Sequence, residues 1–442
     1  MFRALDGDGV AARAEYRQPV IAAMNEFMAP PFSSPRAPKV SCWTDAALLV
    51  SGVLMAWGDG RTIIDRFEDT RHLTRAVLPR GIEPGSTYQG FCKAMLSPRG
   101  MDLLDRARVH LRGQIASRSG RWEKRLGFVA FGADGSRVAC PRTIANETEF
   151  GLWGKGATHP QMNLTCLWHM GVGLTWDWRI AGSDTGERAL LLEMLPSLPE
   201  KALIVADAGF TGFELLNAIQ ESGRYFLVRV GSNVDLLTDL GAYKREGTDT
   251  VYLWPEKHRA REPLVLRLIL VGSVYLITNV LDRTRMSVPK AGMLYRLRWG
   301  IEVGFRTLKQ TLDRRTMRCA APAQAKMELN WSVLGLTLLG LMSVAQIKRR
   351  RKDPLDWSPA ASLRIIRRAR AAPGVSRRDA AAARDQLLKR LGRCTKDDYQ
   401  RNHGKNSWNW PHKKNPAPAG APTLQRASKA LRTRASALNA AA

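Results

Sequence analysis

The chain has 442 residues, of which 45% are hydrophobic, and it carries 68 Lys and Arg against 40 Asp and Glu, a net charge of +28. This apolar content excludes an intrinsically disordered protein and is sufficient for two or three folded domains. The surplus positive charge attracts polyanions, of which nucleic acid is the most common, although a generally basic proteome would give the same charge.

The cysteines and the apolar segments indicate the compartment. The six cysteines form no C-x-x-C pair and are too sparse for a disulfide framework, which argues against a structural zinc site and favours a reducing cytoplasm. Residues 1–30 lack the pattern of a signal peptide. The apolar run 331–347 is barely long enough to span a bilayer and contains four polar residues, so we expect a buried core helix. A cytoplasmic protein with no membrane partner is therefore expected.

The first 120 residues divide into two predicted parts. Residues 1–39 are polar and rich in proline toward their end, which predicts a flexible arm. Residues 40–120 read as helical, and we expect a region for DNA binding or assembly. Residues 65–78 and 86–95 flank a Gly- and Pro-containing turn and could form a helix-turn-helix, with ordinary helical packing as the alternative.

From residue 125 the pattern changes to short apolar strands with helices between them. Two of these strands lead into an aspartate that precedes a small residue, Asp134 before Gly135 and Asp207 before Ala208. Alternating strands and helices predict a central α/β sheet. The predicted organisation is a core in two parts around a β-rich insertion, then a basic tail: residues 125–223, 224–285, 286–347 and 348–442.

The basic helical tail holds much of the charge. Residues 348–442 contain 24 Lys and Arg against 6 Asp and Glu, a net charge of +18 and about two-thirds of the total surplus. Such a segment should bind DNA without sequence preference and release it as salt rises.

One predicted helix concentrates polar residues on a single face. Tyr295, Arg298, Glu302 and Lys309 stand at offsets of 0, 3, 7 and 14 residues, which fall within a stripe about 60° wide at about 100° per residue. One carboxylate between two cations and a phenol suits a metal ion and phosphates. A solvated face of ion pairs would show the same spacing.

Asp134 and Asp207 give Glu302 potential partners. Ligands of open α/β sheets bind at the carboxyl ends of strands, so both aspartates and the helical glutamate could surround one point. Three carboxylates suit Mg²⁺ or Mn²⁺, and two such ions ~3.5–4 Å apart promote displacement at a phosphodiester. Either aspartate alone is also a common turn former.

The spacing Tyr-x2-Arg-x3-Glu-x6-Lys resembles the signature of the insertion-sequence-four family of DDE transposases. The turns 134–136 and 207–210 are similar to the family's two aspartate motifs, and the resemblance spans about residues 125–345. It implies an RNase H-like catalytic core with a β-rich insertion, in which the metal ligands and catalytic residues are Asp134, Asp207 and Glu302, holding Mg²⁺ or Mn²⁺, with two ions expected.

The resemblance also implies the partners. Arg298 and Lys309 would bind phosphates of the terminal inverted repeats, assisted by Tyr295, and a homodimer on DNA would join the ends to target DNA. In related enzymes a tryptophan of the insertion stabilises a flipped base. Trp254 is the only tryptophan in this insertion, and Trp299 could also contact DNA; packing is the alternative for both.

We therefore expect a transposase that cleaves and joins DNA at the ends of an insertion sequence. Two alternatives remain open: a non-catalytic or domesticated sequence-specific DNA-binding protein, and an RNase H-like nuclease. Both would share the charge and the fold, but only a catalytic protein needs the complete acidic triad.

Overall fold

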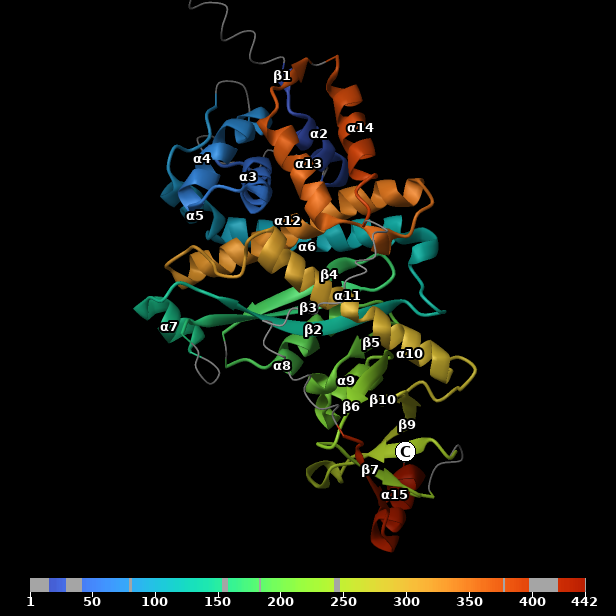
Figure 1. Cartoon of the computed structure of the whole chain (residues 1–442). Coiled ribbons are helices and arrows are strands. Elements are labelled where there is room, and N and C mark those ends of the chain that lie inside the picture. The colour runs from blue at the N-terminus through green and yellow to red at the C-terminus, as the bar shows by residue number, and fades with distance from the viewer. Residues whose placement is uncertain are drawn as a thin grey trace, which may run out of the picture.

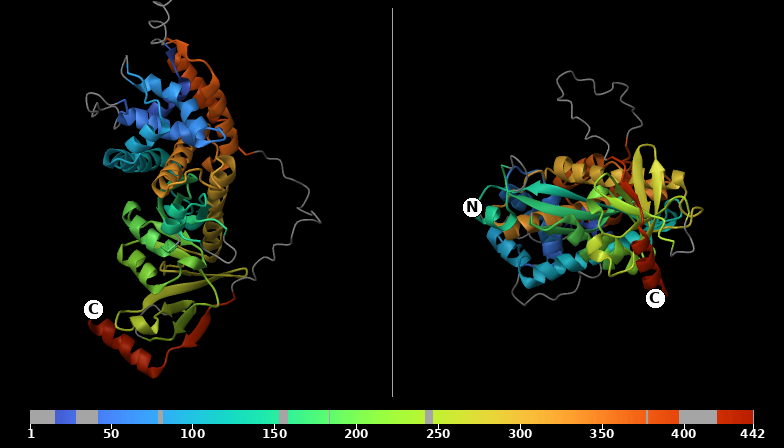
Figure 2. Two further views of the ribbon diagram at one scale, coloured as in Figure 1. Left: turned by 90° about the vertical axis from the view of Figure 1, so that its left-hand side faces the viewer. Right: turned by 90° about the horizontal axis from the view of Figure 1, so that it is seen from below.

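The computed structural model describes residues 16–28, 42–78, 82–152, 158–182, 184–241, 247–376, 378–396 and 420–441. A ten-stranded sheet lies in the middle of an elongated molecule (Figure 1). A bundle of helices covers one end, and the C-terminal helix lies at the other, as the turned views confirm (Figure 2). The architecture is a mixed α/β fold, as the strand and helix patterns predict.

Five strands form the part of the sheet that carries the site. β2 (Ala130–Ala139) pairs antiparallel with β3 (Gln161–His169), which pairs antiparallel with β4 (Leu174–Ala181). On its other side β2 pairs in parallel with β5 (Leu203–Ala206), which pairs in parallel with β6 (Tyr225–Val230). The three parallel strands therefore bring their carboxyl ends to one edge of the sheet.

The insertion predicted over residues 224–285 begins with β6, which pairs with β5 of the central sheet. Its apolar pattern does not distinguish it from the strands that follow, and its parallel partner β5 is known only from the fold. The following strands continue the same sheet rather than forming a separate unit: β7 (Asp235–Thr238), β8 (Thr250–Leu253), β9 (Leu264–Val271) and β10 (Val274–Thr278).

The long apolar segment is a core helix, as predicted. α12 (Pro322–Arg349) is the one helix in the described ranges that is long and apolar enough to cross a membrane, and 89% of its apolar window is buried inside the protein. It packs along α3 (Asp45–Trp57), where the Trp57 indole donates a hydrogen bond to the Gly335 carbonyl at 2.9 Å. A backbone carbonyl of α12 and a buried indole thus fix the N-terminal helices to this core helix.

The arm predicted over residues 1–39 contains a folded helix. α2 (Pro19–Met28) buries Val20, Met24 and Phe27 against the bundle. These three positions follow the spacing of an amphipathic helix, which the short segment and its proline-rich flank obscure in the sequence. The remaining parts of the arm, residues 1–15 and 29–41, lie outside the described residues.

The basic region after residue 348 is not a single tail. α13 (Pro359–Ala371) and α14 (Ala380–Leu391) join the helical bundle, where Leu363 and Leu391 are buried. At the opposite end of the molecule, β12 (Thr423–Arg426) pairs in parallel with β7, and α15 (Lys429–Ala441) follows it (Figure 1). Charge alone could not show this, because the apolar residues that anchor α13 and α14 are separated by arginines.

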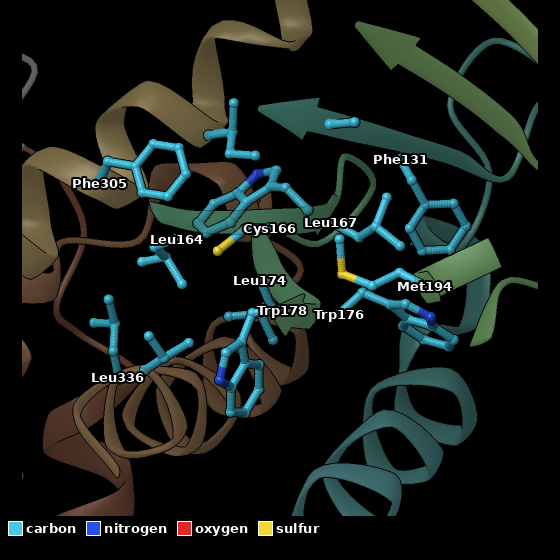
Figure 3. Packing of buried hydrophobic residues seen from close by; sticks show 14 of the residues in the cluster. Phe131, Leu164, Cys166, Leu167, Leu174, Trp176, Trp178, Met194, Phe305 and Leu336 are labelled. Atoms are coloured by element: carbon cyan, nitrogen blue, oxygen red, sulfur yellow. The ribbon is translucent and has the colours of Figure 1, made fainter. Parts of the chain in front are cut away.

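The apolar core continues beneath the sheet. In Figure 3, Leu164 lies on the same side as Phe305 and Leu336 from the helices, whereas Phe131 and Trp176 lie together on the other side, with ring centroids 5.2 Å apart. Phe131 and Leu164 are fully buried, and the other three side chains are nearly so. The strands that carry the site therefore stand on a continuous core.

One histidine in this core should make stability depend on pH. His169 is 1% exposed, and its Nδ1 accepts a hydrogen bond from the Gly171 amide at 3.1 Å. Burial lowers the pKa of His169 to about 4. Because the folded-state pKa lies below the unfolded value of about 6.5, this stabilising contribution is complete above pH 6.5 and is lost as the pH falls toward 4.

We expect the wild-type protein to lose about 2 kcal/mol more unfolding free energy between pH 7 and pH 5 than the His169→Gln variant. Urea unfolding at the two pH values measures the difference. Glutamine keeps an acceptor for the Gly171 amide but cannot be protonated in this range. Equal pH dependence of the two proteins would show that His169 does not titrate as a buried base.

Candidate active site

Two neighbouring parallel strands hold the aspartates. In the pairing of β2 with β5, Ala133 lies opposite Ala206, and these residues directly precede Asp134 and Asp207. The Oδ1 atom of Asp134 accepts a hydrogen bond from the Gly135 amide, and that of Asp207 accepts one from the Gly209 amide, each at 2.9 Å. The fold thus brings the two carboxyl groups to the same edge of the sheet.

Asp134 does not lie in a turn, which corrects the sequence interpretation. β2 continues past it to Ala139, because β3 pairs with the whole strand while β5 pairs only as far as Ala133. At Asp134, strand β2 is therefore still paired with β3 but no longer with β5. The Oδ2 atom of Asp134 accepts a hydrogen bond from Arg298.

The signature segment is helical but not one regular α-helix. α10 (Val288–Leu297) and α11 (Trp299–Arg306) are joined by Arg298, which has helical angles of φ −53° and ψ −32°. The Arg298 amide bonds to the Tyr295 carbonyl, a spacing of three residues, and a π-helical turn (Thr307–Thr311) follows α11. Uniform steps of about 100° therefore do not hold from Tyr295 to Lys309.

Arg298 connects the helix to the strand. Its Nη1 donates to Oδ2 of Asp134 at 3.2 Å, and its Nη2 donates to Oε1 of Glu302 at 3.0 Å. The arginine side chain is only 9% exposed. The sequence predicts a guanidinium group directed toward DNA phosphates, whereas the structure places it inside the site, between two of the three carboxylates.

Electrostatics link the third carboxylate to this pair. Burial raises the pKa of Asp134 to about 6, the nearby charge of Arg298 opposes the rise, and the charges of Asp207 and Glu302 add to it. Such mutual effects require groups within a few ångströms to about one Debye length of each other. The charges of Asp207 and Glu302 are therefore near enough to Asp134 to act on its carboxyl group.

The other signature residues occupy different positions. The Tyr295 ring lies beneath the Arg298 guanidinium, 5.5 Å from its central carbon. Burial raises the pKa of Tyr295. Lys309 is half-buried, and burial followed by the nearby Arg315 lowers its pKa. The described contacts join Tyr295 to the carboxylate site but do not join Lys309 to it.

The two tryptophans proposed for DNA contact differ in accessibility. Trp254 is 2% exposed, and its Nε1 donates to the Arg261 carbonyl at 2.8 Å. Stacking on a flipped base would need this buried ring to become exposed, so the DNA contact of Trp254 stays a prediction beside the alternative of sheet packing. Trp299 is 56% exposed on the first turn of α11, directly beside Arg298.

A fourth carboxyl group near the site escaped the sequence analysis. Glu187 begins α8 (Glu187–Met194), and a Cβ atom at Gly135 would lie 2.0 Å from its Oε1. Burial, followed by the charge of Asp207, raises the pKa of Glu187. Two features of the sequence could have indicated this carboxyl group: the glycine after Asp134, and an acidic residue at the start of the helix that precedes β5.

Glycines on α11 set the distance between Glu302 and the sheet. A Cβ atom at Gly304 would lie 2.8 Å from Cζ3 of Trp168 on β3, and one at Gly300 would lie 3.1 Å from the indole nitrogen. A larger residue at Gly304 would have to displace either the helix or the indole ring. The two glycines flank Glu302 and let its helix lie directly on the sheet.

Comparison with known proteins agrees with this geometry. Residues 130–338 match the family described as Transposase DDE domain. The chain is 27% identical over 227 residues to the transposase InsG for insertion sequence element IS4 of Escherichia coli (strain K12), covering 47% of this chain and 50% of that one. The chain thus spans about half the length of this curated relative.

Among solved structures, the chain is similar to the piggyBac transposase synaptic complex with hairpin DNA. The TM-score is 0.40 and the identity 11%, over 90% of this chain and 89% of the other. The likeness to DDE transposases rests on the sequence matches, and the matched residues 130–338 include the strands and helices that carry all three carboxylates. Over these residues the chain is similar to the Transposase DDE domain, and over 227 residues it is similar to an IS4 transposase.

Proposed function

We propose that this protein is a transposase that cuts DNA at the ends of an insertion sequence and joins those ends to target DNA. Two observations carry the proposal: Asp134 and Asp207 directly follow paired residues of two parallel strands, and Arg298 bridges Asp134 to Glu302. Three carboxylates concentrated at one point have no structural benefit, because their mutual repulsion destabilises the folded chain.

The strand arrangement supports an RNase H-like core. Three antiparallel strands in the order β4-β3-β2 continue into the parallel strands β5 and β6. Two carboxylates come from the adjacent strands β2 and β5, and the third comes from a helix that follows the inserted strands. The insertion extends this sheet at the far side of β6.

The donor set fits Mg²⁺ or Mn²⁺, and we propose that Asp134, Asp207 and Glu302 would hold two such ions. All available donors are carboxylate oxygens, the type that these ions prefer. Bound ions would activate the attacking oxygen and stabilise the leaving oxygen of a phosphodiester. Among the described residues, no three His, Cys, Asp or Glu side chains stand close enough together to hold a metal ion in this conformation, so the three carboxylates would have to move toward one another when an ion binds.

The chain's own residues would position the DNA. Trp299 presents its ring at the surface beside the site, where it can stack on an exposed base. Lys309 can bind a phosphate once the strand excludes water from its half-buried amine. Tyr295 would contact both Arg298 and Arg229, the arginine of β6, at the edge of the carboxylate site. The same proposal includes the terminal repeats and target DNA as substrates. It also includes a homodimer on DNA that acts at the nucleoid in the cytoplasm.

The proposal is tested with a plasmid that carries the element and its flanking sequence. Purified protein with Mg²⁺ or Mn²⁺ should release ends that carry a 3′-hydroxyl group, and EDTA should prevent the release. Retained binding without any cleavage would favour the non-catalytic DNA-binding alternative. Branched DNA of unrelated sequence serves as a competitor. If it suppresses cleavage of the plasmid, an RNase H-like nuclease is favoured.

The C-terminal helix should contribute to non-specific DNA affinity. On α15, Lys429, Arg432 and Arg434 are exposed. Replacing all three by glutamine should flatten the plot of log binding constant against log salt concentration by about 0.9 for each phosphate that the variant no longer neutralises. Binding to a duplex of unrelated sequence between 50 and 200 mM salt measures this slope. An unchanged slope would place the helix away from the DNA.

A further inference from the structure

We propose that Arg298 is an internal counter-ion that holds the place of a metal ion between Asp134 and Glu302, and that metal binding requires its guanidinium group to leave. The inference rests on the proposed function, because it assumes that these carboxylates bind metal. It assigns to Arg298 a positioning role within the protein, in addition to any contact with DNA.

The contacts of Arg298 are those of a substitute cation. Its two terminal nitrogens each bind an oxygen of a different carboxylate, at 3.2 Å to Asp134 and 3.0 Å to Glu302. These two carboxylates come from a strand and a helix that are 168 positions apart at residues 134 and 302. One positive charge therefore closes the gap between two elements that would otherwise repel each other.

A metal ion and the guanidinium group compete for the same oxygens. A carboxylate oxygen that accepts a hydrogen bond from Arg298 has a lone pair directed toward the arginine rather than toward a metal. Placing a divalent cation beside the guanidinium group would also set like charges against each other in a partly buried site. The arginine must therefore move outward when the ion enters.

Arg298 has both a reason and a path to move. Its Nε is buried and has no hydrogen-bond partner, so the resting position leaves a donor unsatisfied. The guanidinium carbon already lies 5.5 Å from the centre of the Tyr295 ring, so a cation–π contact can persist when the guanidinium group moves. A phosphate of a bound DNA strand at the rim could accept the donors that the carboxylates release.

The test is a Mn²⁺ titration of the full-length protein by calorimetry, without DNA. Arg298→Gln should bind Mn²⁺ about tenfold more tightly than wild type, because no internal cation has to be displaced. Arg296→Gln is the matched control, since it removes the same charge from an exposed position two residues away. The control should leave the affinity within about twofold of wild type.

Thermal unfolding gives a second readout that is independent of catalysis. In EDTA, Arg298→Gln should unfold at a lower temperature than wild type, because two carboxylates then face each other without a cation. Saturating Mn²⁺ should remove most of that difference. Arg298→Lys keeps the charge but can reach only one carboxylate well, so its Mn²⁺ affinity should lie between those of the other two proteins.

The outcomes separate this inference from the proposed function. If wild type binds Mn²⁺ and Arg298→Gln binds it equally or more weakly, the counter-ion role is overturned while the metal site stands. If Arg298→Gln and Arg296→Gln tighten binding equally, the effect is general charge and the inference also fails. If no variant binds Mn²⁺, the proposed metal site and the inference are both wrong.

Discussion

Replacing Glu302 by glutamine should abolish DNA cleavage and leave DNA binding nearly intact. The change removes one negatively charged metal ligand, and losing several kcal/mol of transition-state stabilisation lowers the cleavage rate at least about a thousandfold. The glutamine oxygen can still accept the hydrogen bond that Arg298 Nη2 now donates to Oε1 at 3.0 Å. Folding should therefore be retained, and reduced negative charge near the DNA should not weaken binding.

Cleavage of an end-bearing plasmid with Mg²⁺ and a mobility-shift titration measure the two effects separately. Glu256→Gln is a suitable control, because it makes the same chemical change at an exposed carboxylate on a different segment. The control should cleave at the wild-type rate. Cleavage by Glu302→Gln within about tenfold of wild type would remove Glu302 from the proposed set of metal ligands.

The sequence predicts the three carboxylates because the pattern around each is local. An apolar strand that leads into an aspartate and a small residue can be recognised without knowing its neighbours, and so can the spacing from Tyr295 to Lys309. The convergence of Asp134 with Asp207 depends on a parallel pairing between distant segments. This convergence can be expected from the sequence only through the rule that ligands bind at the carboxyl ends of parallel strands, or through the family resemblance.

The direction of Arg298 shows where local reasoning stops. Helical spacing indicates which residues share a face of the helix. Which face points toward the sheet depends on the side chains that the sheet presents to the helix. Here Gly300 and Gly304 bring the helix close to Trp168, and the acidic strand then attracts the arginine inward. The burial of Trp254 has a related cause, because it depends on strands that pair over long distances.

The folded parts of the predicted arm and tail have a related cause. α2 and α14 are short, and each gains stability by packing in the bundle rather than from its own helical propensity. Their basic or proline-rich surroundings dominate any compositional average. The net charge of a region indicates which partners it attracts. It does not indicate whether the apolar residues between the charges pack against another part of the protein.

The closeness of α11 to the sheet leads to the last prediction. Gly304→Ala should lower both stability and cleavage, because the added Cβ would lie 2.8 Å from Cζ3 of Trp168 and must displace the helix that carries Glu302. Overpacking of this kind costs ~1–3 kcal/mol, and moving a catalytic group by about 1 Å can lower the rate about a hundredfold.

Gly113→Ala provides the matched control for helical propensity. A Cβ at Gly113 in α6 (Pro98–Ser119) meets nothing within 4 Å, so this change should stabilise the protein by up to about 1 kcal/mol. Differential scanning calorimetry and the plasmid cleavage assay compare the two variants. Adding Trp168→Phe to Gly304→Ala should restore part of the cleavage, because the smaller ring makes room for the new methyl group. A Gly304→Ala protein that resembles Gly113→Ala in both assays would show that the glycine does not set the position of Glu302.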